Sequence, residues 1–268
     1  MQKMWSSVVG WMWSSRRTGA WKRAESRALP VQCKEQRERF KAHDTQEGIS
    51  HRRSIVRKEA LVPTVSQFPP RTMWEERYGA EEFIFGTDPN DFLRENLSAL
   101  GSGNVLCLAE GEGRNAVFLA ENGLAVSSVD LTETGVAKTH RLAAERGVVV
   151  DAVTGDLADF DLGIEKWDAI VSIFAHTPPA IRIDLHRRAV ASLVPGGIFL
   201  LEAYTPDQVG RGTGGPQVPE LTMTAEGLRD ELEPLEFLII QELKRDVIEG
   251  PGHTGEGAVV QVIARKAK

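Results

Sequence analysis

Two glycines and two glutamates lie together where a short apolar run at residues 105–108 gives way to a helical pattern. The turn between them, residues 109–113, reads AEGEG. Because Gly111 and Gly113 have no Cβ, a ligand can approach their backbone closely. The first N–H groups of the helix that follows have no partner within the helix and point toward the same place. We therefore predict a ligand site at this turn, with Glu110, Gly111 and Gly113 in contact with the ligand.

A carboxylate follows the next apolar run of the chain. Residues 124–129 read LAVSSV, and Asp130 comes directly after them. At the carboxyl end of a parallel strand, an acidic side chain in this position accepts hydrogen bonds from the hydroxyls of a ribose. The order of strand, glycine turn, helix, strand and acid predicts a site for a nucleoside cofactor, with Asp130 on the ribose.

The charge of the turn distinguishes between two nucleoside cofactors. Residues 111–116 formally fit the glycine pattern of dinucleotide sites, which is a weak signal alone. However, Glu110 and Glu112 flank Gly111, and two carboxylates would repel the phosphates of a dinucleotide. S-adenosylmethionine brings a sulfonium and an ammonium instead. Asp156, in the GDL sequence at 155–157, can accept a hydrogen bond from an adenine amino group. The sequence thus favours S-adenosylmethionine; an NAD-type oxidoreductase and a cofactor-binding module without catalysis are the alternatives.

Apolar runs alternate with helical patterns through most of the chain, which predicts an α/β fold with a doubly wound, mostly parallel sheet. Near the end, two β-rich runs flank a glycine-rich loop, and this order predicts a terminal antiparallel hairpin. One helix is expected to begin with Asp88 as its N-cap and Pro89 at its first position. The expected strands are 105–108, 124–129, 148–153, 168–174, 197–203, 235–247 and 258–263, and the expected helices are 89–100, 114–121, 133–145 and 178–193.

Two histidines are candidates for the acceptor side of the site. His176 directly follows the strand expected at 168–174, and ligands of open α/β sheets bind beyond the carboxyl ends of the strands. His253 lies in the loop expected at 250–257. A hydroxyl acceptor would need one of them as a base, whereas a soft nucleophile containing sulfur, selenium or tellurium needs little assistance. The alternatives are a helix cap for His176 and an ordinary surface loop for His253.

Residues 205–222 contain four glycines and three prolines and follow the strand expected at 197–203. A loop of this length inside a compact domain is typically a lid or a binding loop. We expect it to form the acceptor-side wall, with the residues around Arg211 lining the same pocket as His176. A disordered surface insert is the alternative.

These motifs together resemble the class I S-adenosylmethionine-dependent methyltransferases over residues 73–268. The sequences LAEGEG, VD, GDL, WDAIVSIF and LVPGG appear in the order of that family. The start, MWEERY at 73–78 with Phe85-Gly86, is similar to the group of tellurite-resistance and thiopurine methyltransferases, in which such an amino-terminal segment folds over the cofactor. The resemblance implies a Rossmann-like sheet of seven strands.

The resemblance also implies roles for single residues. Gly111 and Gly113 would lie under the methionine moiety, Asp130 on the ribose and Asp156 at the adenine. Two positions depart from the family: Ala109 replaces the usual glycine and Cys107 the usual acid, whose work Glu110 would take over. The remaining residues expected at the cofactor are Trp74, Tyr78, Leu131, Leu157 and Ile173.

The first 72 residues differ from the rest in composition. They contain 15 Lys and Arg against 6 Asp and Glu, and four of the six tryptophans lie within the first 21 positions. We expect a basic, disordered extension before a methyltransferase domain at 73–268. The first 24 residues have the basic, acid-free composition of an organelle transit peptide. An extension without a role in the working protein and a basic nucleic-acid arm are the other interpretations.

Composition also bounds the partners. Residues 73–268 are acidic, which argues against a nucleic-acid substrate, because phosphate contacts need clustered Lys and Arg. No apolar run approaches the roughly 20 residues of a membrane helix. Cys33 and Cys107 form neither a disulfide framework nor a zinc-ligand pattern. We expect a cytoplasmic monomer or weak homodimer that acts on a small molecule, or an organelle protein if the transit-peptide interpretation holds.

Overall fold

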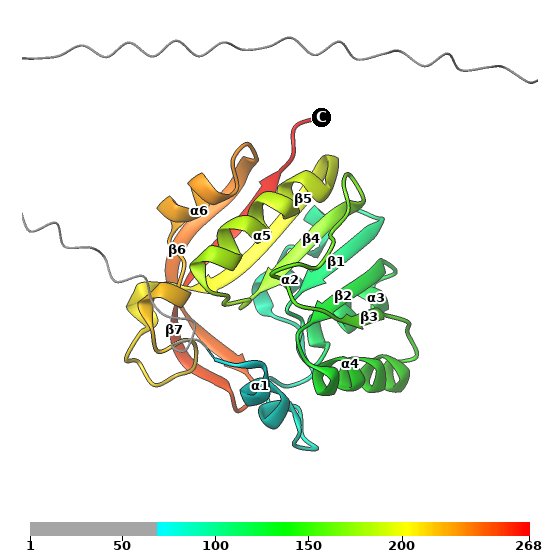
Figure 1. Cartoon of the computed structure of the whole chain (residues 1–268), viewed down its shortest axis with the longest axis vertical. Coiled ribbons are helices and arrows are strands. Elements are labelled where there is room, and N and C mark those ends of the chain that lie inside the picture. The colour runs from blue at the N-terminus through cyan, green and yellow to red at the C-terminus, as the bar shows by residue number, and fades with distance from the viewer. Residues whose placement is uncertain (1–68) are drawn as a thin grey trace, which may run out of the picture. The chain divides into compact units, whose positions relative to one another are not determined.

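The computed structural model describes residues 69–268, whose strands form one sheet in the order β3-β2-β1-β4-β5-β7-β6 (Figure 1). The first five strands are parallel, whereas β7 is antiparallel to both β5 and β6. The predicted doubly wound sheet with a terminal antiparallel hairpin is confirmed. The strands are β1 (Asn104–Leu108), β2 (Ala125–Asp130), β3 (Asp151–Thr154), β4 (Trp167–Ile173), β5 (Leu193–Tyr204), β6 (Glu236–Glu249) and β7 (His253–Arg265).

Helices cover both faces of this sheet, and each face has its own apolar core. Alternate residues of β1 divide between the cores: Leu106 and Leu108 pack with α5 and α6, whereas Val105 and Cys107 pack with α2, α3 and α4. The helices are α1 (Arg71–Tyr78), α2 (Asp91–Glu95), α3 (Arg114–Glu121), α4 (Glu133–Arg146), α5 (Pro179–Ser192) and α6 (Ala225–Glu231). Single 3₁₀ turns occur at Leu97–Leu100, Pro206–Gln208 and Pro219–Leu221.

The helix expected over residues 89–100 was predicted with the wrong start and the wrong length. It begins at Asp91, and Asn90 is its N-cap, because the Asn90 side chain accepts a hydrogen bond of 3.0 Å from the backbone N–H of Leu93. After Glu95 the chain continues as a 3₁₀ helix. The strand expected at 148–153 is shorter and begins later, at Asp151, and α6 was not predicted.

The loop expected at residues 250–257 is mostly strand. β7 begins at His253, which pairs with Glu249 of β6, so that only three residues form the turn. The glycines that suggested a loop make room for packing instead. A Cβ on Gly255 would lie 2.6 Å from the Thr213 side chain, and one on Gly257 would lie 2.9 Å from Val247.

The predicted extension at residues 1–72 lies outside the described residues except for its last four. Of these four, Arg71 and Thr72 already belong to α1. None of the helices between residues 69 and 268 is long and apolar enough to span a membrane.

Candidate active site

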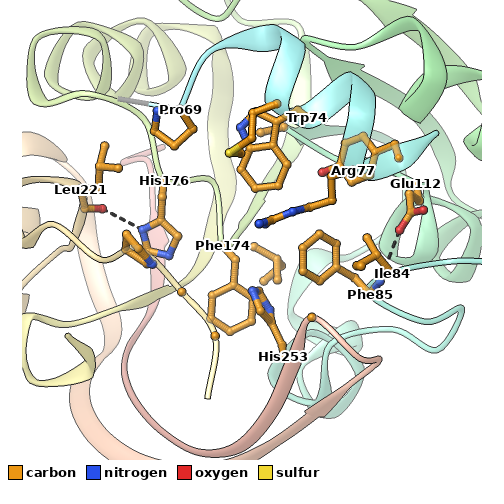
Figure 2. A pocket seen from close by; sticks show the side chains of 18 of the residues that line it. Pro69, Trp74, Arg77, Ile84, Phe85, Glu112, Phe174, His176, Leu221 and His253 are labelled. Atoms are coloured by element: carbon orange, nitrogen blue, oxygen red, sulfur yellow. Dashed lines mark hydrogen bonds between the residues drawn. The ribbon is translucent and has the colours of Figure 1, made fainter. Parts of the chain in front are cut away.

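A cavity of about 530 Å³ lies at the carboxyl ends of β1 and β4 (Figure 2). Its walls come from α1 and the segment after it, the glycine turn, the end of β4, the segment at 205–222 and the β6–β7 turn. Ligands of open α/β sheets bind at this edge. The cavity is lined by Pro69, Met73, Trp74, Arg77, Tyr78, Ile84, Phe85, Ala109, Glu110, Glu112, Arg114, Asn115, Ile173, Phe174, His176, Gly214, Gly215, Pro216, Gln217, Val218, Leu221, Gly252 and His253.

Glu110 occupies the amino-terminal end of α3. Its Oε1 accepts hydrogen bonds of 2.8 Å from the backbone N–H groups of Asn115 and Ala116. Burial raises the pKa of Glu110 to about 7, although these hydrogen bonds act in the opposite direction. A dinucleotide would place a phosphate at this helix end, so the carboxylate already takes the position that the phosphate needs.

Glu112 differs from Glu110, and it changes the charge argument made from the sequence. Its carboxylate pairs with the ammonium of Lys138 at 2.7 Å and accepts a hydrogen bond of 3.3 Å from the backbone N–H of Phe85. Glu112 and Lys138 are both buried. The negative charge of Glu112 is therefore neutralised, and repulsion of a dinucleotide depends on Glu110 alone.

The glycine turn has the backbone conformation that glycine favours. Ala109, Gly111 and Gly113 have φ values of 48°, 65° and 94°, so Ala109 also adopts the left-handed conformation. A Cβ on Gly113 would lie 2.7 Å from Thr139 of α4, and one on Gly111 would lie 2.8 Å from the Tyr78 hydroxyl. Gly113 thus allows close packing against α4, and Gly111 allows α1 to approach. Neither glycine is among the residues that line the cavity.

Asp130 ties the end of β2 to the glycine turn. One carboxylate oxygen accepts a hydrogen bond of 2.8 Å from Gly111 N–H, and the other accepts bonds of 2.9 and 2.6 Å from the Thr132 N–H and hydroxyl. Burial raises the pKa of Asp130. Both oxygens therefore already have protein partners, and binding of a ribose by Asp130 stays a prediction.

The other residues expected at the adenosine end lie outside the lining of the cavity. Leu131 is half-buried after β2, Asp156 is exposed and accepts a hydrogen bond of 2.9 Å from Ala158 N–H, and Leu157 belongs to the apolar core. Ile173, at the end of β4, does line the cavity.

Helix α1 covers the glycine turn and carries both aromatic residues expected there. Trp74 and Tyr78 line the cavity, with their ring centroids 5.7 Å apart. Between them, Glu75 caps α4: its carboxylate accepts hydrogen bonds from the backbone N–H groups of Glu133 and Thr134 at 3.0 and 3.2 Å, and from the Thr134 hydroxyl at 2.6 Å. These bonds hold α1 over this end of the sheet.

His176 lines the cavity, but both of its ring nitrogens are engaged. Nδ1 lies 2.8 Å from the carbonyl oxygen of Leu221 and must donate to it, while Nε2 accepts from the backbone N–H of Tyr204 at 3.3 Å. The ring is neutral in this arrangement, and burial lowers its pKa to about 4. With no free lone pair, His176 is not placed as a base. It is not a helix cap either, because α5 has Pro178 at its N-cap and no side-chain cap.

His253 has the opposite character. Neither ring nitrogen makes a hydrogen bond with any of residues 69–268, and its Nδ1 is buried. The ring lies among aromatic neighbours, with centroids 4.6 Å from Phe85, 4.9 Å from Phe174 and 5.4 Å from Tyr204 (Figure 2). Burial lowers its pKa to about 3. Because β7 begins at this residue, the β6–β7 hairpin fixes its position.

The sequence of the central strands is similar to that of a known family. Residues 105–197, which contain the glycine turn, Asp130 and β4, match the family model of a methyltransferase domain. The match covers less than half of the chain. Among curated proteins, none matches this sequence.

Several solved structures share the fold of this chain. One comes from work on the conversion of a disulfide bond into a thioacetal group during echinomycin biosynthesis; it is 20% identical, with a TM-score of 0.60 over 74% of this chain and 91% of the other. TehB from Haemophilus influenzae is 18% identical, with a TM-score of 0.55 over 73% and 66%. The [4+2]-cyclase SpnF is 17% identical, with a TM-score of 0.52 over 72% and 90%. At these identities, the likeness concerns the fold.

The segment at 205–222 forms one wall of the cavity through residues 214–218 and Leu221. Gln208 holds it in place: its Nε2 donates to the Thr213 hydroxyl at 3.0 Å and to the carbonyl of Gly214 at 2.9 Å, and its Oε1 accepts from Ala258 N–H at 2.9 Å. The expected wall is confirmed for 214–218. Arg211 itself was wrongly placed, because it pairs with Glu256 and does not line the cavity.

Several residues that line the cavity were not singled out in the sequence. Phe174 has a φ of 52° and turns its ring into the cavity, stacked at 4.5 Å on Tyr204. Phe85 and Arg77 lie within the motifs that suggested a covering segment, but nothing in a single sequence marks them as cavity residues. Arg114 pairs with Glu249, and both residues are buried.

Proposed function

We propose that this domain transfers a methyl group from S-adenosylmethionine to a small molecule whose acceptor atom is a soft nucleophile, such as a thiolate. One observation carries the proposal: neither histidine that lines the cavity is placed to act as an effective base. Both nitrogens of His176 are engaged, and the pKa of His253 is about 3. A hydroxyl acceptor would need a base near neutral pH, whereas a thiol ionises at moderate pH and is a strong nucleophile as the thiolate.

We assign the methionine end of the cofactor to the part of the cavity next to Glu110 and Ile173. Trp74 and Tyr78 would cover it from α1, and the ring of Phe174 would lie against it. The adenosine end would extend toward Asp130, Leu131, Asp156 and Leu157, beyond the cavity walls. Support comes from the Glu110 carboxylate, which already occupies the helix end where a dinucleotide would place a phosphate. When bound, S-adenosylmethionine supplies an electrophilic methyl group on a sulfonium.

The protein's own contribution would be positioning and exclusion of water. Phe85, Phe174 and His253 form an aromatic wall on which a small acceptor can be oriented, and Leu221 lies on the opposite side (Figure 2). Correct positioning of two reactants is worth up to roughly 7–11 kcal/mol of the barrier. The neutral imidazole of His253 would donate or accept one hydrogen bond that orients the acceptor.

Sulfur chemistry is also the subject of one structural relative, the protein studied for conversion of a disulfide bond into a thioacetal group. However, a [4+2]-cyclase, named for a different reaction, has the same fold. The fold alone therefore does not establish methyl transfer, which must be measured directly.

The proposal is tested by calorimetry and by turnover. The purified protein is titrated with S-adenosylmethionine, S-adenosylhomocysteine and NAD, and methyl transfer is then measured with benzenethiol and phenol as matched acceptors. We expect both adenosyl compounds to bind, NAD not to bind, and benzenethiol to be methylated at least tenfold faster than phenol. Faster methylation of phenol would contradict the soft-acceptor proposal, and binding of NAD alone would contradict the assignment of the cavity.

A further inference from the structure

The charged side chains that line the cavity are matched with partners, with one exception. Glu110 accepts two backbone N–H groups, Glu112 pairs with Lys138, and Arg114 pairs with Glu249. The side chain of Arg77 makes no ion pair and no hydrogen bond with any of residues 69–268. The cavity therefore has one positive charge without a counter-ion among these residues.

The position of Arg77 directs this charge into the cavity. It lies in the last turn of α1, and its guanidinium carbon is 4.9 Å from the centroid of the Trp74 ring. Figure 2 shows the guanidinium pointing into the space in front of Phe85 and Phe174.

An unpaired guanidinium in such surroundings suits a planar anion. Arginine presents a rigid fork of N–H donors that matches a carboxylate or another oxyanion in two parallel hydrogen bonds. The guanidinium carbon lies over the Trp74 ring, and a guanidinium on an aromatic face can still donate its N–H groups to an anion. By contrast, an acceptor with a cationic group near Arg77 would be repelled by the guanidinium.

We propose that Arg77 binds a carboxylate or similar oxyanion of a ligand in this cavity. This inference rests on the proposed function, because that function places two ligands in the cavity, and either could carry the oxyanion. The oxyanion belongs either to the methionine moiety of the cofactor or to the methyl acceptor. If it belongs to the acceptor, Arg77 determines acceptor specificity.

The first arm of the test measures cofactor binding by calorimetry. Arg77→Met and Arg77→Lys are titrated with S-adenosylhomocysteine and with its decarboxylated analogue, which lacks only the carboxylate. Arg229→Met is the matched control, because Arg229 is also an exposed arginine in the last turn of a helix, with its guanidinium 5.4 Å from the centroid of the Phe237 ring. If the anion is the cofactor's, Arg77→Met lowers the affinity for S-adenosylhomocysteine at least tenfold and leaves the analogue within twofold.

The second arm measures acceptors. Binding and methylation of 4-mercaptobenzoate, benzenethiol and 4-aminobenzenethiol are compared in the same proteins. If the anion is the acceptor's, Arg77→Met leaves S-adenosylhomocysteine binding unchanged and raises KM at least tenfold for 4-mercaptobenzoate alone. Arg77→Lys keeps the charge without the fork and should lie between wild type and Arg77→Met, while Arg229→Met should match wild type.

Two results would overturn the inference: Arg77→Met has no effect in either arm, or the wild type binds neither S-adenosylhomocysteine nor 4-mercaptobenzoate. A different result would contradict only the proposed function. If the wild type binds these anions through Arg77 but methylates no acceptor, the anion site stands and methyl transfer to a soft acceptor does not.

Discussion

The two sides of the cavity satisfy their polar groups differently. On the side of the glycine turn, Glu110, Glu112, Asp130 and Glu75 each accept from at least two protein donors. On the opposite side, the cavity is aromatic, and the Nδ1 of His253 is buried without a partner among residues 69–268.

This contrast indicates which side of the cavity stabilises the fold and which side has polar groups available to a ligand. A buried polar group without a partner costs about 1–3 kcal/mol, so a folded protein rarely retains one without a reason. The hydrogen bonds and the ion pair on the glycine-turn side hold β1, β2, α1 and α4 together around the turn. His253, with its buried unpaired Nδ1, lines the cavity, and so does Arg77, an exposed residue of α1 without a partner among residues 69–268. We expect mutations on the first side to change stability and mutations on the second to change ligand binding or turnover.

The largest effect on stability is expected for Asp130→Ala. The substitution leaves the N–H of Gly111 and the N–H and hydroxyl of Thr132 without their acceptor, and each buried unpaired group costs about 1–3 kcal/mol. We expect the free energy of unfolding to fall by at least about 2 kcal/mol and S-adenosylhomocysteine affinity to fall as well. Urea denaturation and calorimetry measure the two quantities. Asp156→Ala, at an exposed residue with one backbone bond, is the control, and an equal loss of stability there would contradict the contrast.

A second test compares the two histidines. His176→Ala removes two hydrogen bonds that join β4, β5 and the segment at 205–222, and we expect it to lower the free energy of unfolding by about 1–3 kcal/mol. His253→Phe removes a buried unsatisfied nitrogen and keeps the aromatic packing, so its stability should match or exceed that of wild type. Turnover with benzenethiol should fall in His253→Phe. A clear loss of stability in His253→Phe with unchanged turnover would reverse the roles.

The sequence predicted the parts of this domain that depend on local pattern. The β1–α3–β2 unit follows from apolar runs and a glycine turn, and α3 begins and ends at the expected residues, 114 and 121. The strands of the sheet were predicted because both faces are covered and the runs are therefore continuously apolar. The site residues in this unit, Glu110 and Asp130, were identified by their place after a strand.

What the sequence did not predict depends on contacts between distant segments. The glycines near the end of the chain suggested a loop, yet Gly255 and Gly257 lie in β7, where they leave room for Thr213 and Val247. The engagement of His176 depends on Leu221 and Tyr204, which are 45 and 28 residues away. No local pattern encodes such pairs. Sequence position alone could not tell which histidine keeps a free nitrogen.

A smaller effect is expected for the contact between α1 and α4, and it depends on pH. The hydrogen bonds from the Thr134 side chain and from the backbone of Glu133 and Thr134 lower the pKa of Glu75 to about 2, from an ordinary value of 4.5. Because the folded state holds the ionised form, this contribution is complete above pH 4.5 and is lost as the pH falls toward 2. A helix cap of this kind is worth about 1 kcal/mol. We expect Glu75→Gln to reduce the difference in unfolding free energy between pH 6 and pH 3, measured by denaturation at both values. A pH dependence identical to that of wild type would contradict this role.

The smallest expected effect concerns the turn itself. Ala109 has a φ of 48°, a left-handed conformation that costs an L-residue about 1–2 kcal/mol, whereas glycine adopts it freely. Glycine also loses more conformational freedom on folding, by about 0.5–1 kcal/mol relative to alanine. The strain relieved at Ala109 exceeds the entropic cost of glycine. We therefore expect Ala109→Gly to raise the free energy of unfolding by about 0.5 kcal/mol, measured by urea denaturation. Ala120→Gly, inside α3, is the control and should lower it by about 1 kcal/mol. If both substitutions destabilise equally, the left-handed conformation of Ala109 does not cost the folded protein stability.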